Sequence, residues 1–148
     1  MATVSSIPPF RDDGWLPIGH HPTTWEEIVA RFKGEMASSR FESTKRLIEL
    51  RDTLRRLGVS GYLLLDGSYI SAKDEPKDFD LLLVASPEIQ AMKDASPELA
   101  RWLDSERAEK ESGYSIFYCP SDSTALELLS SLWDQDKAGV PKGIVKVL

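Results

Sequence analysis

Two short apolar runs in the middle of the chain constrain its fold more than any other feature. They cover residues 62–65 and 79–84, and the second run has an apolar residue at every position except Asp80. Runs of this length are typical of β-strands, and apolar residues on both of their alternating faces indicate a strand that is covered on both sides. The sequence therefore predicts a central, buried strand at residues 79–84.

The remaining elements follow from helix and strand signals. Thr24 followed by Glu27 forms a capping box, and leucines recur at three- and four-residue steps in the segment that ends at Gly58. Pro97, with Ser96 as N-cap, is expected to split a helical region at 87–111. The predicted order is helix, helix, strand, strand, helix, strand, helix, strand, at about 24–32, 38–57, 62–65, 79–84, 87–111, 114–119, 123–134 and 143–148.

These elements predict one α/β (α+β) domain, with a mixed β-sheet flanked by helices over residues 24–148. Residues 1–23 carry four prolines, which argue against a helix, and embedded aromatic residues, which argue against a free tail. We expect an extended arm packed on the core. His20 and His21 within it are interpreted as part of a surface loop, since a metal site needs further converging ligands.

Composition excludes several classes of function. The chain has 148 residues, a formal net charge of −6 and 41% hydrophobic residues, and no apolar run approaches the roughly 20 residues of a membrane helix. The lone Cys119 excludes an intrachain disulfide, which fits a reducing cytoplasm. The most basic segment interleaves cations and acids, as on a solvated helix face with i,i+4 pairs. We therefore expect a small-molecule or protein partner, and neither a membrane nor a nucleic acid.

The chemistry-bearing residues surround the two apolar runs. Asp66, Gly67 and Ser68 follow the first run, and Asp78 with Asp80 opens the second. Residues i and i+2 of a strand share a face, so the carboxylates of Asp78 and Asp80 are expected to lie side by side. Two such carboxylates are suitable ligands for Mg²⁺ or Mn²⁺ beside a nucleotide phosphate. Asp66 is expected to fix the turn through backbone N–H groups rather than to bind metal.

The turn and the following loop are candidate phosphate-binding elements. Gly67 lacks a Cβ and allows a tight turn with close approach of phosphate, and the Ser68 hydroxyl can donate to a phosphate oxygen. Lys73 and Lys77 lie between the turn and the aspartates, where their charges could neutralise phosphate. Neither a Gly-Ser turn nor an Asp-x-Asp pair is specific alone. Their combination between two apolar strands is rarer, and the alternative is an unrelated α/β domain with a polar loop.

The spacing from Gly67-Ser68 to Asp78-x-Asp80, followed by Leu81-Leu82-Leu83-Val84, resembles the signature of the polymerase-beta-type nucleotidyltransferase superfamily, in its minimal nucleotidyltransferase-like branch. The chain also resembles an uncharacterised bacterial family of small nucleotidyltransferase-like proteins, in its Ile7-Pro8-Pro9-Phe10, Trp15-Leu16-Pro17 and 139–144 segments. The resemblance implies Asp78 and Asp80 as catalytic metal ligands. It also implies Mg²⁺-dependent transfer of a nucleoside monophosphate from a triphosphate to a hydroxyl, in one version on a toxin paired with an antitoxin.

One departure from the superfamily leaves activity open. Active members usually place a third carboxylate on the neighbouring strand, which by resemblance falls near Tyr114 or Ser115. Glu109 and Glu111 precede that strand and would have to swing in to replace it. Three hypotheses therefore stay open: a transferase, a catalytically degenerate fold that binds a nucleotide or a protein, and an unrelated interaction domain.

Overall fold

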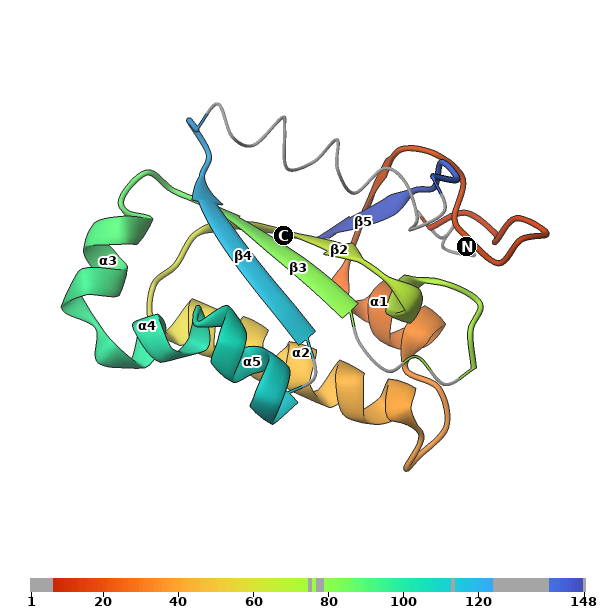
Figure 1. Ribbon diagram of the computed structural model, residues 1–148, viewed down its shortest axis with the longest axis horizontal. Helices are drawn as coiled ribbons and strands as arrows, with labels where there is room; N and C mark the ends of the chain where they lie inside the picture. The colour runs from red at the N-terminus through yellow and green to blue at the C-terminus, as the bar shows by residue number, and fades with distance from the viewer. Residues whose placement is uncertain (1–6, 75, 77–78, 113, 124–138, 148) are drawn as a thin grey trace, which may run out of the picture.

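The computed structural model describes residues 7–74, 76, 79–112, 114–123 and 139–147. In these residues the chain is a single α+β domain with a five-stranded mixed sheet and five α-helices (Figure 1). The elements are β1 (His20–Thr23), α1 (Trp25–Phe32), α2 (Ser39–Arg56), β2 (Gly61–Asp66), the 3-10 turn η1 (Ser68–Ile70), β3 (Phe79–Ala85), α3 (Ile89–Ala95), α4 (Pro97–Trp102), α5 (Ser105–Ser112), β4 (Tyr114–Pro120) and β5 (Ile144–Val147). The predicted fold class is confirmed.

β3 is an interior strand that is buried on both faces, as its apolar sequence predicted. The strand order is β1-β5-β2-β3-β4, with β3 antiparallel to β2 and parallel to β4. Leu81, Leu82 and Val84 are fully buried, although they point to alternating faces. Full burial of one such side chain contributes about 1.5–3 kcal/mol, so this strand supplies a large part of the core's stability.

One face of the sheet packs against helices. Leu63, Leu83 and Val147 line a small cavity together with Trp25 of α1 and Leu54 of α2. The described helices gather on the same side of the sheet in Figure 1. Side chains of even-numbered residues in β2 and β3, which include Asp66 and Asp80, therefore point to the other face.

A row of aromatic rings runs through the core from the arm to β4. Neighbouring rings have centroids 5.1–6.2 Å apart and are tilted against one another. Such pairs contribute about 0.5–1.5 kcal/mol each beyond their buried area. The row ties the arm, α1, η1, β3 and β4 together, in the order Phe10, Phe32, Tyr69, Phe79 and Tyr114.

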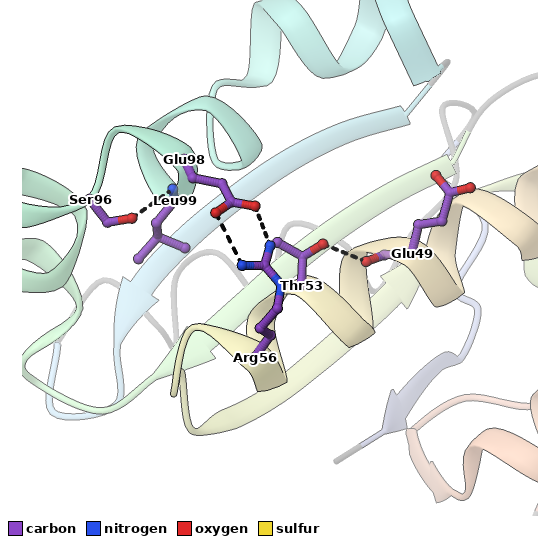
Figure 2. Close-up of polar contacts among 6 residues, drawn as sticks. All are labelled: Glu49, Thr53, Arg56, Ser96, Glu98 and Leu99. Carbon is purple, nitrogen blue, oxygen red and sulfur yellow. Dashed lines mark hydrogen bonds and ion pairs between the residues drawn. The ribbon is translucent and has the colours of Figure 1, made fainter.

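The helix ends follow the predicted capping signals. The Thr24 side chain accepts a hydrogen bond from the Glu27 amide at 3.3 Å, and Ser96 accepts one from the Leu99 amide at 3.2 Å (Figure 2). The region 87–111 is divided twice rather than once, because the chain also turns between α4 and α5. No helix in the described part of the chain combines the length and apolar character needed to cross a membrane.

A surface ion pair connects α4 with the end of α2. Arg56 and Glu98 form it on the surface, through both guanidinium NH groups and both carboxylate oxygens (Figure 2). In the basic segment, Arg51 pairs with the adjacent Asp52 at 2.8 Å. The expected i,i+4 pairs within α2 stay a prediction.

The arm ends in an edge strand. His20–Thr23 form β1, which pairs in parallel with β5, so the expectation of a surface loop at His20 and His21 is wrong. Pro22 is compatible with this strand because β1 lies at the sheet edge. At Gly143, next to β5, an added Cβ would collide with the Pro17 carbonyl oxygen and lie 2.7 Å from Nε2 of His21. The arm and the segment before β5 therefore touch closely.

Two predictions remain untested. The helix expected at 123–134 lies, apart from its first residue, within residues 124–138, which are outside the described part of the chain. The division into an arm at 1–23 and a domain at 24–148 also stays a prediction, although β1 now places the end of that arm within the sheet.

Candidate active site

Two aspartates face each other across neighbouring strands. Asp66 ends β2 and is directly opposite Asp80 near the start of β3. Opposed residues of an antiparallel pair share a face, with Cβ atoms about 4.5–5.5 Å apart. Asp66 is 5% exposed, and Asp80 is half-buried. The structure thus brings together two carboxylates that are far apart in the sequence motif.

Lys142 forms an ion pair with Asp66. The Lys142 ammonium donates to Oδ1 of Asp66 in the interior, where the lysine is only 3% exposed. Burial lowers the pKa of Lys142 to about 8, so the side chain still carries its charge at neutral pH. Its Nζ also lies 5.1 Å from the centre of the Trp15 ring. Asp66 was expected to hold the turn through backbone N–H groups; its carboxylate binds Lys142 instead.

The turn after β2 has a backbone conformation that favours glycine. Gly67 has a φ of 95°, in the region that L side chains rarely adopt. The Ser71 amide donates to the Ser68 carbonyl at 3.1 Å, which closes η1. Ser68 is half-buried at the start of this turn. The predicted tight bend at Gly67 and Ser68 is therefore present, directly beside the Asp66 carboxylate.

A buried arginine holds the loop that follows the turn. Arg40, 8% exposed, donates to the carbonyl oxygens of Tyr69 at 2.5 Å, Ser71 at 2.5 Å and Lys73 at 2.9 Å. Arg40 was not among the predicted site residues. A usable signal exists, because Arg40, Thr44 and Leu47 follow one another at steps of four and three on the buried stripe of α2.

The loop and the arm enclose a cleft. An open cavity of about 450 Å³ is lined by Asp12, Asp13, Gly14, Trp15, Ser68, Ser71, Ala72 and Lys73. Two of the four predicted phosphate-binding residues, Ser68 and Lys73, therefore meet in one cleft, with Gly67 adjacent in the chain. The other one, Lys77, lies outside the described residues together with Asp78, so the predicted pairing of Asp78 with Asp80 stays a prediction.

The strand next to β3 carries a serine in register with Asp80, and this serine contacts a carboxylate. Ser115 of β4 is in register with Asp80, at the position where a third acid was sought. Its hydroxyl donates to Oε1 of Glu109 at 2.7 Å. Glu109, which was expected to replace the third carboxylate only by swinging in, thus contacts the residue that pairs with Asp80.

Comparison with known proteins assigns the chain to a family. One family model matches residues 8–148, which is nearly the whole chain. The chain belongs to DUF6932, a family of unknown function. No curated protein and no solved structure gives a significant match.

In this DUF6932 member, the described acids fit a single divalent cation better than a closed metal cage. No group of three or more His, Cys, Asp or Glu side chains converges in the described ranges. The Asp80 carboxylate has the oxygen donors that Mg²⁺ prefers, and Mg²⁺ commonly uses one or two carboxylates with phosphate oxygens completing its shell. The Asp66 carboxylate is bound by Lys142. Asp80 would therefore be the principal described ligand.

Proposed function

We propose that this protein is a nucleotidyltransferase-like enzyme, which binds a nucleoside triphosphate with Mg²⁺ and transfers the nucleoside monophosphate to a hydroxyl. The observation that carries the proposal is the position of Asp80 opposite Asp66, beside the Gly67-Ser68 bend. The Ser68–Lys73 side of the cleft adds hydroxyl and ammonium groups suited to phosphate. These are the same residue types that the sequence motif predicted.

The chain's own groups would divide the work. Ser68 donates to a phosphate oxygen, Lys73 offsets phosphate charge, and Asp80 holds the cation. When bound, Mg²⁺ or Mn²⁺ supplies Lewis-acid stabilisation of the developing phosphate charge. The acceptor hydroxyl loses its proton to water as its oxygen bonds to the α-phosphorus, the bond from the α-phosphorus to the bridging oxygen of the β-phosphate breaks, and pyrophosphate leaves. Glu109 accepts a hydrogen bond from Ser115, the β4 residue in register with Asp80, and is the nearest recorded counterpart of the third carboxylate in the described residues.

Labelled transfer tests this proposal. Purified protein is incubated with α-phosphate-labelled ATP, GTP, CTP or UTP, Mg²⁺ or Mn²⁺, and a cell lysate as source of acceptors. We expect wild type to attach label, Asp80→Asn to attach none, and Glu98→Gln to match wild type, because Glu98 is a surface acid paired with Arg56. A protein partner such as a toxin would be identified as the labelled species. Equal labelling by wild type and Asp80→Asn would contradict the proposal.

A second function is favoured by the Asp66–Lys142 pair. An ammonium already neutralises one of the two opposed carboxylates, and the β4 position opposite Asp80 is a serine. Both features suit a module that binds a nucleotide or a protein without chemistry. Such a module would be stabilised by nucleotide, by about 2.7 kcal/mol at 100 times the dissociation constant, without forming product. A nucleotide-dependent rise in melting temperature without labelled product would select this function.

A further inference from the structure

The cleft between the arm and the 68–73 loop has the size of a small-ligand site. Its volume of about 450 Å³ lies within the roughly 300–1,000 Å³ typical of such pockets. One wall is the arm, at residues 12–15, and the other is the loop after β2. The phosphate-binding motif accounts for only one of these walls. The arm wall, with its indole ring and carboxylates, has no role in that motif.

Both walls are fixed by hydrogen bonds within the protein. On the loop side Arg40 binds successive carbonyl oxygens. On the arm side the Asp13 carboxylate accepts from the Trp15 amide at 3.1 Å and pairs with Arg11 at 2.7 Å. The Ala72 amide donates to the Gly14 carbonyl at 2.9 Å and joins the two walls. A preformed cleft of this kind lowers the entropy cost of ligand binding.

Trp15 provides an aromatic surface at this cleft. The ring is half-buried and lines the cavity, while the Lys142 ammonium lies 5.1 Å from its centre. An indole ring in this position can stack on a planar aromatic ligand, and its contact with Lys142 connects the cleft to the Asp66 ion pair. Nucleobases are planar rings that stack well on tryptophan.

The polar groups give the cleft two different ends. Lys73 is exposed, and its ammonium has no ion pair recorded among the described residues. Asp12 is an exposed carboxylate on the opposite wall. A carboxylate only accepts hydrogen bonds, so it suits the amino groups of a base and repels phosphate. The charges therefore orient a nucleotide with its phosphates toward Lys73 and its base toward the arm.

We propose that the arm is the base-binding half of a nucleotide site, in which the base stacks on Trp15 while the phosphates lie along Ser68 and Lys73. This inference rests on the proposed function for the identity of the ligand, and it assigns the arm a role that the phosphate-binding motif does not contain. The ligand class is a purine nucleotide, since the larger ring system covers more of the indole and its guanine or adenine amino group reaches a carboxylate acceptor.

Calorimetric titration separates the base from the phosphates. Wild type, Trp15→Leu and Trp15→Phe are each titrated with GTP, ATP and inorganic triphosphate in the presence of Mg²⁺. We expect Trp15→Leu to weaken both nucleotides about tenfold, the scale of one base–aromatic stack, and to leave inorganic triphosphate unchanged. Trp15→Phe should retain most of the nucleotide affinity, because it keeps an aromatic face.

Trp102 provides the matched control. It is also half-buried, with the guanidinium of Arg107 5.3 Å from its ring centre, but it lies on α4 away from the cleft. Trp102→Leu should bind all three ligands like wild type. Equal nucleotide affinity in Trp15→Leu and wild type, or no nucleotide binding by wild type, overturns the inference. If Trp15→Leu loses nucleotide affinity while wild type transfers no label, the inference stands and the transferase function fails.

Discussion

Two ion pairs in this protein lie in opposite surroundings, one on the surface and one in the interior. Arg56 and Glu98 meet on the surface, where each favours the other's charge: the hydrogen bond from Arg56 lowers the pKa of Glu98, and Glu98 raises the pKa of Arg56. Lys142 and Asp66 meet in the interior, where burial lowers the pKa of Lys142. Pairing thus favours the charged forms of both groups at the surface. In the interior, burial disfavours the charged form of Lys142.

The difference teaches what each pair does. Exposed pairs are screened by water and salt and contribute little to stability. A buried pair costs desolvation of both partners and is a weak source of net stability, yet removal of one partner leaves an uncompensated charge. The Asp66–Lys142 pair therefore fixes an arrangement: it holds the segment before β5 against the end of β2, beside the candidate site.

The largest expected effect comes from Lys142→Met. This change leaves the Asp66 carboxylate buried without its partner, and we expect the free energy of unfolding to fall by about 3–5 kcal/mol. Urea denaturation measures it. The double variant Asp66→Leu with Lys142→Met removes both charges and should recover most of the loss. A single variant as stable as wild type would show that the pair does not constrain the fold.

A smaller effect is expected from pH. The folded pKa of Lys142 is about 8, below the ordinary value of 10.5, so between these values the unfolded chain binds more protons than the folded one. The free energy of unfolding of wild type should therefore rise with pH across this range, by up to about 3 kcal/mol relative to Lys142→Met. Denaturation of both proteins at pH 7.5, 8.5 and 9.5 measures the difference. Parallel curves would contradict the lowered pKa.

The smallest effect is expected at the surface pair. Arg56→Ala and Glu98→Ala remove partners that are half exposed to solvent, so their denaturation midpoints should match that of wild type within error. The exchanged variant Arg56→Glu with Glu98→Arg should fold equally well. Repeating the measurements at low and high salt sharpens the contrast, since screening acts on this pair and hardly on the buried one. A large loss in either single variant would break the comparison.

The local signals in the sequence predicted much of the fold. The capping residues Thr24 and Ser96 and the apolar residues of β3 each act over a few positions, and the structure confirms them. The strand β1 was missed because it is short, contains Pro22 and forms only by pairing with the distant β5. The break between α4 and α5 was missed because no proline or glycine marks it.

The candidate site shows the same division. The bend at Gly67 and the face of Asp80 follow from the local chain, so they could be predicted. The Lys142–Asp66 contact joins positions 76 residues apart, and a single lysine between a proline and a glycine carries no sign of its partner. Arg40 was overlooked because arginine normally indicates a solvent-facing helix position, whereas its carbonyl partners lie in a loop far along the chain.

The close approach at Gly143 has a consequence for how the protein is made. The β1 strand can pair with β5 only after the ribosome has made β5, so β1 lacks this partner strand while residues 24–143 are synthesised. Contacts between such distant positions form slowly. Trp15 and Lys142, which meet beside Asp66, therefore come together only after the segment before β5 has been made.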